Sequence, residues 1–263
     1  MTQDLKGKTA IVTGSTSGIG LGIAHLLAKS GANVMLNGFG DAAEIEKTRQ
    51  SIEAEGNGKV AYNGADVTKA DQVAAMVEAA KAAFGSVDIL VNNAGIQFVA
   101  PVEEFPLEKW DAVIATNLSS AFYGIRSALP VMRKAGWGRI INIASAHGLV
   151  ASAQKIAYVS AKHGIVGMTK VVALETAGQG ITCNAICPGW VLTPLVQKQI
   201  DAIAAKENIS VQAASDKLLG EKQPSKQFVK PEDIGGMVLY LCSASAEQIT
   251  GAALSIDGGW TAG

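Results

Sequence analysis

The segment Thr9-Ala-Ile-Val-Thr-Gly-Ser-Thr-Ser-Gly-Ile-Gly20 predicts how the chain begins to fold. Its first five residues form a short, mostly apolar run, which is typical of a buried strand. A glycine-rich turn follows, and apolar residues at helical spacing continue over residues 19–29. Gly14, Gly18 and Gly20 leave backbone amides open to a pyrophosphate, which the positive end of the helix would stabilise. A tight turn that binds nothing is the alternative.

This strand and helix pattern recurs along the chain. Helix-like stretches separate the further strand candidates, which are residues 33–37, 60–65, 89–92, 139–144, 181–186 and 253–256. Strongly apolar strands between amphipathic helices indicate a parallel sheet that is covered on both faces by right-handed crossovers. We therefore predict an α/β fold, with a Rossmann-type doubly wound sheet in a three-layer α/β/α sandwich.

Length and composition favour a single domain over residues 1–263. The chain is 48% hydrophobic and contains 29 glycines, and it has no Pro/Ser-rich linker, charge block or internal repeat. A net charge of -1 without a Lys/Arg cluster argues against nucleic acid as a partner. Three cysteines form neither a disulfide framework nor a zinc site, so we expect them to be small core residues and expect no bound metal.

The N-terminal residues are polar and lack the apolar core of a secretory signal. The sequence also has no run of 18 apolar residues that would span a membrane. Together with the few cysteines, these observations favour a cytoplasmic protein without a membrane partner. A peripheral association with a membrane that leaves no sequence signal would be equally compatible with these observations.

Four residues of chemical interest follow strand candidates within two positions, namely Gly14, Asn93, Ser145 and Pro188. In a doubly wound sheet, ligands bind beyond the carboxyl ends of the strands, where the strand order reverses. We therefore expect these four residues to line one cleft.

Tyr158 and Lys162 stand four residues apart, so in a helix they would share a face. A neighbouring ammonium favours the phenolate, and it can lower the pKa of a phenol from ~10 by roughly one to three units. The pair would then supply a base near neutral pH, which predicts an enzyme. A solvated helix face is the alternative, because this spacing often arises by chance.

The end of the second strand candidate bears on the choice of dinucleotide. NAD sites often carry an acid there, which binds the adenosine ribose. Here the strand ends in Leu36-Asn-Gly-Phe-Gly-Asp41, so Asn37, the backbone near Phe39, or Asp41 must serve instead. No Arg or Lys lies nearby to neutralise a ribose 2′-phosphate, and we therefore predict NAD rather than NADP.

The whole chain resembles the short-chain dehydrogenase/reductase family in the order and spacing of several motifs. These are the glycine turn, Asn92-Asn-Ala-Gly95, Asn117, Ser145, Tyr158-x3-Lys162, and Pro188-Gly189 after the sixth strand candidate. The resemblance implies a nicotinamide-dependent oxidoreductase. It also implies a homotetramer built from paired long helices and the C-terminal strands.

The resemblance implies roles for individual residues as well. Tyr158 would be the general base, and Ser145 would hydrogen-bond the reacting oxygen. Lys162 would stabilise the phenolate and position the nicotinamide ribose. Asn117 would hold water in a proton relay, which is compatible with a simple bond to a backbone carbonyl. The residues expected to line the cofactor, besides Tyr158 and Lys162, are Gly14, Ser17, Gly18, Ile19, Gly20, Phe39, Asp66, Val67, Asn93, Gly95, Pro188, Gly189, Val191 and Thr193.

The same resemblance, carried by polar and aromatic residues near these motifs, implies a small hydroxy acid as substrate. Amides, an imidazole and one ammonium can converge on a carboxylate, and the ammonium contact would be charge-assisted. Each residue also has an ordinary alternative, such as a core histidine, a solvated lysine or a tryptophan that fills the core. The candidate donors are Gln97, His147, Lys155 and Gln199, and the candidate pocket walls are Trp190 and Trp260.

Residues 193–226 are rich in helix formers and predict a mobile lid whose closure would exclude water from the substrate. Other substrates of the family, such as a sugar, a steroid or a 3-oxoacyl thioester, are alternatives to the hydroxy acid. A dinucleotide sensor without activity is a further alternative, because a fold alone does not establish activity.

Overall fold

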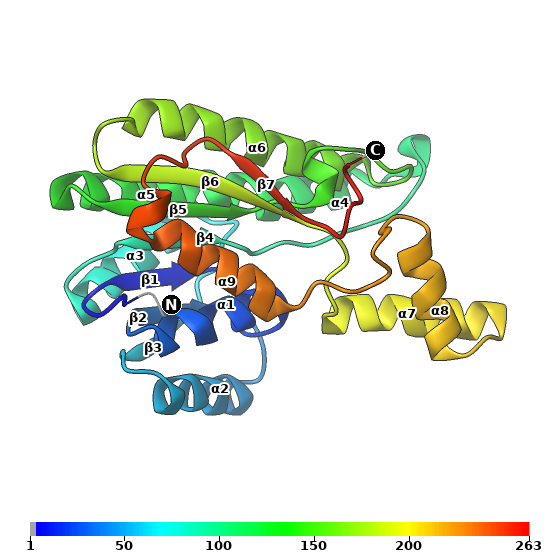
Figure 1. Cartoon of the computed structure of the whole chain (residues 1–263), viewed down its shortest axis with the longest axis horizontal. Helices are drawn as coiled ribbons and strands as arrows, with labels where there is room; N and C mark the ends of the chain where they lie inside the picture. Colours follow the sequence, from blue (N-terminus) through cyan, green and yellow to red (C-terminus); the bar gives the residue numbers. More distant parts are fainter. Residues whose placement is uncertain (1–3, 263) are drawn as a thin grey trace.

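The computed structural model describes residues 4–262 and contains one seven-stranded parallel sheet (Figure 1). The strand order is β3-β2-β1-β4-β5-β6-β7, so the order reverses between β1 and β4. This is the doubly wound sheet that the sequence predicts. The strands are β1 (Thr9–Val12), β2 (Asn33–Asn37), β3 (Val60–Asn63), β4 (Ile89–Asn92), β5 (Gly138–Ile143), β6 (Ile181–Pro188) and β7 (Ala253–Ile256).

Two strand ends differ most from the prediction. β3 ends at Asn63 because this residue turns the chain, its Oδ1 accepting the amide of Ala65 at 3.0 Å. The side-chain amide of Asn37, at the end of β2, then donates to the carbonyls of Asn63 and Ala65 at 3.0 and 2.9 Å. β6 extends through Pro188, which therefore ends the strand instead of following it.

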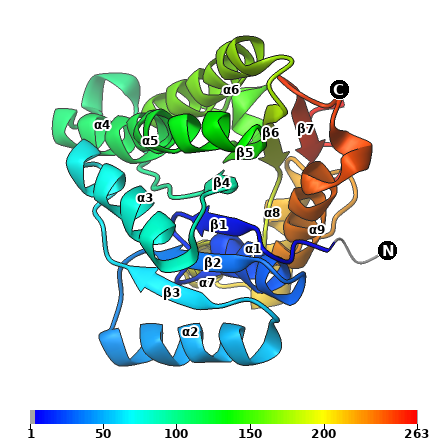
Figure 2. The ribbon, with the colours of Figure 1, turned by 90° about the vertical axis from the view of Figure 1, so that its left-hand side faces the viewer.

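Helices cover both faces of the sheet (Figures 1 and 2). Helices α1, α2 and α9 pack on one face, and α3, α5 and α6 pack on the other. The strand residues alternate accordingly, since Ala10 and Val12 join the first apolar cluster and Ile11 joins the second. The predicted three-layer sandwich is thus confirmed. The α-helices are α1 (Gly18–Lys29), α2 (Ala42–Glu55), α3 (Ala70–Phe84), α4 (Leu107–Ile114), α5 (Ser120–Ala135), α6 (Ile156–Thr176), α7 (Pro194–Glu207), α8 (Val211–Gly220) and α9 (Pro231–Cys242).

Helices α7 and α8, together the α7–α8 arm, lie beyond the carboxyl edge of the sheet (Figure 1). Thr193 and Ser210 cap the two N-termini, because each hydroxyl accepts a backbone amide from the first turn. The arm occupies most of the segment 193–226. Its helices bury a small apolar cluster of their own, formed by Val196, Ile200, Ala204, Ala214 and Leu218.

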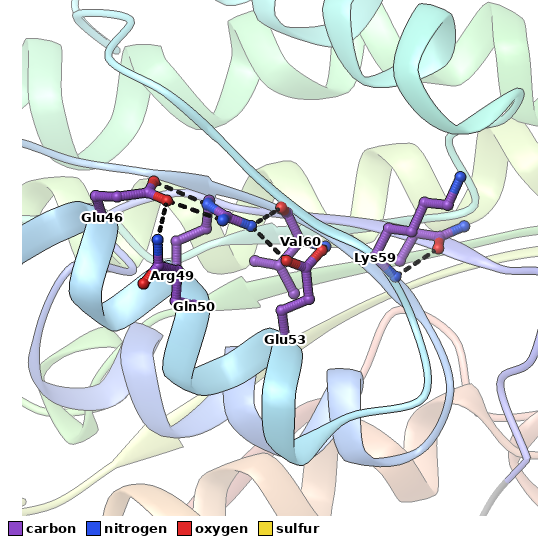
Figure 3. Close-up of polar contacts among 7 residues, drawn as sticks. Glu46, Arg49, Gln50, Glu53, Lys59 and Val60 are labelled. Atoms are coloured by element: carbon purple, nitrogen blue, oxygen red, sulfur yellow. Dashed lines mark hydrogen bonds and ion pairs between the residues drawn. The ribbon is translucent and has the colours of Figure 1, made fainter.

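A charged network holds the edge strand β3 to α2 (Figure 3). Arg49 donates to the carbonyl of Val60 at 2.8 Å, and Glu53 accepts the amide of Val60 at 3.0 Å. Arg49 also pairs with Glu53 and Glu46 at 2.7 and 2.8 Å. Both backbone groups of Val60 are therefore satisfied on an edge strand, where they would otherwise be open to pairing with another chain.

The three cysteines, Cys183, Cys187 and Cys242, are free and buried, as expected for small core residues. Within residues 4–262, no helix is long and apolar enough to cross a membrane. The same residues contain no group of three His, Cys, Asp or Glu side chains placed to hold a metal ion.

Candidate active site

Two adjoining cavities open at the carboxyl edge of the sheet. The glycine-turn cavity lies over the ends of β1, β2, β3 and β4, and the tyrosine cavity lies over the ends of β5 and β6. Ile19 and Thr193 line both cavities, which are therefore contiguous. The structure thus brings the segments that follow these strands together, as the alternation of strands and helices predicts.

The glycines of the first turn have two different uses. Gly14 has a φ of +63°, and a Cβ added there would lie 3.0 Å from the Cα of Ala94. Gly18 has a φ of +57° and faces Thr193. Both line the glycine-turn cavity. Gly20 does not line this cavity. A Cβ added to Gly20 would lie 2.4 Å from the carbonyl oxygen of Gly14, so α1 meets the turn closely at this position. Gly20 therefore lets α1 pack against the turn, whereas Gly14 and Gly18 supply left-handed backbone in the cavity wall.

The N-terminus of α1 borders the glycine-turn cavity. Its N-cap, Ser17, makes no side-chain capping hydrogen bond and lines the cavity. Asn93 fastens the turn from β4, because its side-chain amide donates to the carbonyls of Thr13 and Gly14 at 2.8 and 3.0 Å. Uncapped backbone amides at a helix N-terminus suit an anion. The residues present therefore fit the pyrophosphate of a dinucleotide.

The far end of the glycine-turn cavity is formed after β2 and β3. Asp66 is the one charged side chain among the described residues that line this cavity. Hydrogen bonds from Thr68 hold the pKa of the Asp66 carboxyl below its usual value, so it is ionised at neutral pH. Val67 lies beside it in the lining, and Gly95 contributes from the segment after β4. The predicted adenosine end thus has a polar but almost uncharged wall.

The three candidates for the ribose contact are placed differently. Asn37 and Phe39 line the cavity, and Phe39 is 68% exposed. The hydroxyl of Thr16 donates to the carbonyl of Phe39 at 3.1 Å and so fixes this loop. Asp41 lies outside the lining, because its carboxylate accepts two backbone amides as the N-cap of α2.

Ser145 and Tyr158 line the tyrosine cavity from two elements. Ser145 lies two residues after the end of β5, and Tyr158 lies in the first turn of α6. The hydroxyl of Ser145 accepts the amide of His147 at 3.1 Å, which orients the serine side chain. The predicted pair of Ser145 and Tyr158 therefore shares one cavity.

Lys162 lies beneath this cavity and does not line it. It is 4% exposed, and its ammonium donates to the carbonyl of Ile143 at 2.7 Å. The Nζ atom is 5.6 Å from the centroid of the Tyr158 ring. Burial lowers the pKa of Lys162 to about 8.

The expectation that a cation lowers the pKa of Tyr158 is not met. Burial raises the pKa of its phenol, and hydrogen bonding with Ser145 only partly opposes this effect. Sequence spacing correctly places Lys162 near the tyrosine ring, but burial is the main cause of the shift in the pKa of Tyr158.

Asn117 lies in a π-helical segment, Ala115–Ser119, between α4 and α5. Its side chain is buried and is bonded to the backbone of Ile96 in both directions: Oδ1 accepts the Ile96 amide at 2.8 Å, and Nδ2 donates to the Ile96 carbonyl at 2.9 Å. The backbone bond considered for Asn117 is therefore present. Neither cavity is lined by Asn117 itself.

All six candidate substrate residues line the tyrosine cavity. The Trp190 and Trp260 rings are 5.9 Å apart, and the His147 ring lies 5.0 Å from that of Trp260. The ammonium of Lys155 lies 5.4 Å from the centroid of the Trp190 ring. The lining also contains Pro188, Gly189 and Val191, and the six candidates are Gln97, His147, Lys155, Trp190, Gln199 and Trp260.

The two basic groups of the tyrosine cavity differ in charge. Burial, reinforced by the charge of Lys155, lowers the pKa of His147 to about 4, so the imidazole is neutral at pH 7. Its Nε2 is 2.9 Å from the hydroxyl of Ser152. Burial, followed by repulsion from Lys222, lowers the pKa of Lys155 as well. A carboxylate bound at Lys155 would offset both the loss of solvent and the repulsion from Lys222, because it would pair with the ammonium.

Sequence reasoning missed several lining residues. Ile143 and Ala144 precede Ser145 at the end of β5, so their position after an apolar strand was an available signal. Val196 reaches the tyrosine cavity from α7, and no sequence pattern indicates that contact. In the glycine-turn cavity the missed residues flank predicted ones: Thr16, Gly38, Ala65, Thr68, Ala94, Ile96, Thr116 and Pro194.

Comparison with known proteins agrees with this geometry. A family model described as enoyl-(acyl carrier protein) reductase matches residues 14–261. A D-beta-hydroxybutyrate dehydrogenase of Cupriavidus necator is 60% identical over 98% of this chain and 99% of that protein. The protein of the same name from Rhizobium meliloti is 54% identical over 97% and 99%. The crystal structure of L-sorbose reductase from Gluconobacter frateurii, complexed with NADPH and L-sorbose, has a TM-score of 0.94 and 31% identity over 99% of each chain. The chain is therefore an oxidoreductase that belongs to the short-chain dehydrogenase/reductase family.

Proposed function

We propose that this enzyme catalyses the reversible, NAD-dependent oxidation of (R)-3-hydroxybutyrate to acetoacetate. The observation that carries the proposal is the lining of the tyrosine cavity, in which one lysine, neutral donors and two tryptophans surround Ser145 and Tyr158. The name of two relatives at 60% and 54% identity supports the same substrate. A sugar or a steroid alcohol would bring no carboxylate to pair with the ammonium in the cavity wall.

The carboxylate of the substrate is proposed to bind Lys155. This ammonium is the one lysine side chain in the described lining of the tyrosine cavity, and its charge is poorly solvated. The neutral imidazole of His147 and the amides of Gln97 and Gln199 add hydrogen bonds without adding charge. A single carboxylate is therefore matched by a single close cation. The two tryptophan rings supply an apolar wall for the short alkyl chain.

Tyr158 is proposed as the general base. Its phenolic oxygen accepts the proton of the 3-hydroxyl, and Ser145 hydrogen-bonds the same substrate oxygen as that carbon becomes a carbonyl. Lys162, whose pKa is about 8, would keep a positive charge near the phenolate at neutral pH. Asn117 holds the segment around Ile96 and would connect the site to solvent through water. The nicotinamide, when bound, would supply the hydride acceptor for C3.

NAD is proposed over NADP on the charge of the glycine-turn cavity. Its described lining contains no Arg or Lys, and its one charged side chain, Asp66, is an anion. A ribose 2′-phosphate would therefore find no cation there. Gly14, Gly18 and Ser17 are proposed to hold the pyrophosphate.

We also propose that the α7–α8 arm acts as a lid, that four copies assemble, and that the enzyme works in the cytoplasm. Gln199 and Val196 reach the tyrosine cavity from the arm, so closure of α7 would bring groups toward the substrate. Exposed apolar side chains on α5 and α6, namely Phe122, Val171 and Leu174, support contacts between copies.

The test is NADH formation by purified enzyme at mildly alkaline pH. Reactions contain NAD and (R)-3-hydroxybutyrate, with the S enantiomer and NADP as parallel controls. We expect rapid reduction of NAD with the R enantiomer and little with either control. A folded enzyme that binds NAD but oxidises neither enantiomer would contradict the substrate assignment and would redirect the search to uncharged alcohols.

A further inference from the structure

Gln223 lies after α8 and is a buried polar side chain, 1% exposed, that lines neither cavity. Its Oε1 accepts the backbone amide of Trp190 at 2.8 Å, and its Nε2 donates to the backbone carbonyl of Gln227. Both partners are backbone groups, so the orientation of the side-chain amide is determined by its neighbours. The proposed chemistry assigns no part to this buried group.

Two loops beside the tyrosine cavity close over Gln223. A Cβ added to Gly189, in the loop after β6, would lie 2.5 Å from Gln223 Oε1. A Cβ added to Gly258, in the loop after β7, would lie 2.8 Å from Gln223 Cγ. The absence of side chains at both glycines therefore allows the close approach. These loops lead to Trp190 and Trp260, the two aromatic walls of the cavity.

Gln223 is also tied to the α7–α8 arm. Its backbone amide donates to the carbonyl of Leu219, in the last turn of α8, at 2.8 Å. Three residues further along the chain, Lys226 has a φ of +52°, and its backbone amide donates to the carbonyl of Gln223 at 2.9 Å. The side chain of Gln223 therefore sits where the arm rejoins the body of the protein.

Trp190 is held through both of its backbone groups. The backbone amide of Trp190 donates to Oε1 of Gln223, and the backbone carbonyl of Trp190 accepts the amide of Val229 at 2.9 Å. The indole ring then lies against Trp260 and near the ammonium of Lys155. A shift of the Trp190 backbone would therefore move a wall that faces the group proposed to bind the carboxylate.

We infer that Gln223 is a positioning residue that couples the α7–α8 arm to Trp190 and so sets the fit of the hydroxy acid. The inference rests on the proposed function, because that function assigns the tyrosine cavity to the substrate. Glutamine suits the position since one planar group offers an acceptor to Trp190 and a donor to Gln227. An apolar side chain of similar size would leave both backbone groups without these partners.

Kinetics of Gln223→Met and Gln223→Glu test the inference, with Gln227→Met as the matched control. Gln223→Met should raise KM for (R)-3-hydroxybutyrate roughly tenfold, because the hydrogen bond that holds the Trp190 amide is lost. The variant should change kcat less. Glutamate keeps the acceptor for Trp190, so Gln223→Glu should fall between wild type and Gln223→Met. The side chain of Gln227 is exposed and only its carbonyl is used, so the control should match wild type. NAD affinity should change by less than about twofold in every variant.

Hydrogen exchange at the Trp190 amide gives a second measurement that needs no substrate. Exchange in Gln223→Met should be at least about tenfold faster than in wild type, while the amides of β1 keep their rates. If Gln223→Met does not fold, Gln223→Glu carries both measurements. An unchanged KM, an equal loss of NAD and substrate affinity, or unchanged exchange at Trp190 would overturn the inference. If wild type does not oxidise the acid, the proposed function fails, and the exchange rates alone decide the role of Gln223.

Discussion

The two ends of β5 each carry a buried cation. Arg139, at the amino end, is 2% exposed, and Lys162, which reaches the carboxyl end from α6, is 4% exposed. Both donate to backbone carbonyls, Arg139 to those of Gly138 and Gly180 at 2.8 and 3.0 Å and Lys162 to that of Ile143 at 2.7 Å. Neither forms an ion pair with a carboxylate of residues 4–262. The difference between them lies in what else each cation touches.

At the amino end the cation is part of a packed aromatic contact. The Cζ atom of Arg139 lies 4.4 Å from the centroid of the Trp137 ring, and Lys8 Nζ lies 4.0 Å from the same centroid. Burial lowers the pKa of Arg139, but a guanidinium begins so high that it keeps its proton wherever the protein is folded. This end of β5 therefore carries a permanent charge with a structural use.

At the carboxyl end the cation faces a reactive group. Burial brings the pKa of Lys162 to about 8, which lies within the range where an enzyme can work. Its ammonium has three donors, and the carbonyl of Ile143 occupies one of them. The comparison teaches that the fold buries a cation at either end of one strand, and that the choice of lysine or arginine decides whether the charge can titrate.

The largest effect should come from removing the reactive group at the carboxyl end. Tyr158→Phe should lower kcat at least about 10³-fold, because the proposed general base is lost while the ring and its packing are kept. NAD affinity and the free energy of unfolding should stay near the wild-type values. Steady-state kinetics, NAD titration and urea unfolding check this together. Substantial turnover by the variant would show that another group accepts the proton.

The sequence was informative for residues whose place follows from a strand end or from helical spacing. Asn93 directly follows β4, Ser145 lies two residues after β5, and Lys162 lies one turn from Tyr158 on α6. These positions depend on local geometry that a short segment carries within itself. The six substrate candidates were inferred from the family resemblance and from their polar or aromatic character, and all six line the tyrosine cavity.

Other features depend on contacts between distant segments and were not predictable. The raised pKa of Tyr158 results from burial, about which the Tyr-x3-Lys spacing says nothing. Gln223 bonds a residue 33 positions away, and Arg139 bonds a carbonyl 41 positions away. Asp41 was a reasonable ribose ligand by position, but it caps α2. A polar residue near a site can serve the ligand or its own helix, and only the packed structure separates these uses.

An exchange of cation type at the carboxyl end should have the next largest effect. Lys162→Arg keeps the charge, but the larger guanidinium does not reproduce the ammonium contact with Ile143, so we expect kcat to fall about 10²-fold. Stability should also respond to pH. The folded pKa of Lys162 is about 8 against an ordinary 10.5, so between these values the unfolded wild type binds more protons and its stability rises with pH.

Arginine does not titrate in that window, so the free energy of unfolding of wild type minus that of Lys162→Arg should grow from about pH 8 to about pH 10.5. Urea unfolding at several pH values measures this difference. Taking the difference between the two proteins also cancels the opposite effect of Tyr158 and the cysteines, whose raised pKa values weaken the fold at alkaline pH. A flat difference would mean that Lys162 is not desolvated as the structure indicates.

The reciprocal exchange at the amino end should have the smallest effect. Arg139→Lys should cost about 1–2 kcal/mol of stability at pH 7, since an ammonium cannot reproduce the contact of the planar guanidinium with the Trp137 ring. It should leave kcat and KM within about twofold, and urea unfolding beside steady-state kinetics checks both. The exposed Arg133, changed to lysine, is the matched control and should change stability by less than about 0.5 kcal/mol.

A buried lysine at position 139 should also introduce an alkaline rise in stability like that of Lys162. A large loss of kcat in Arg139→Lys would instead show that the charge at the amino end of β5 reaches the site, and the division between a structural and a catalytic cation would be wrong.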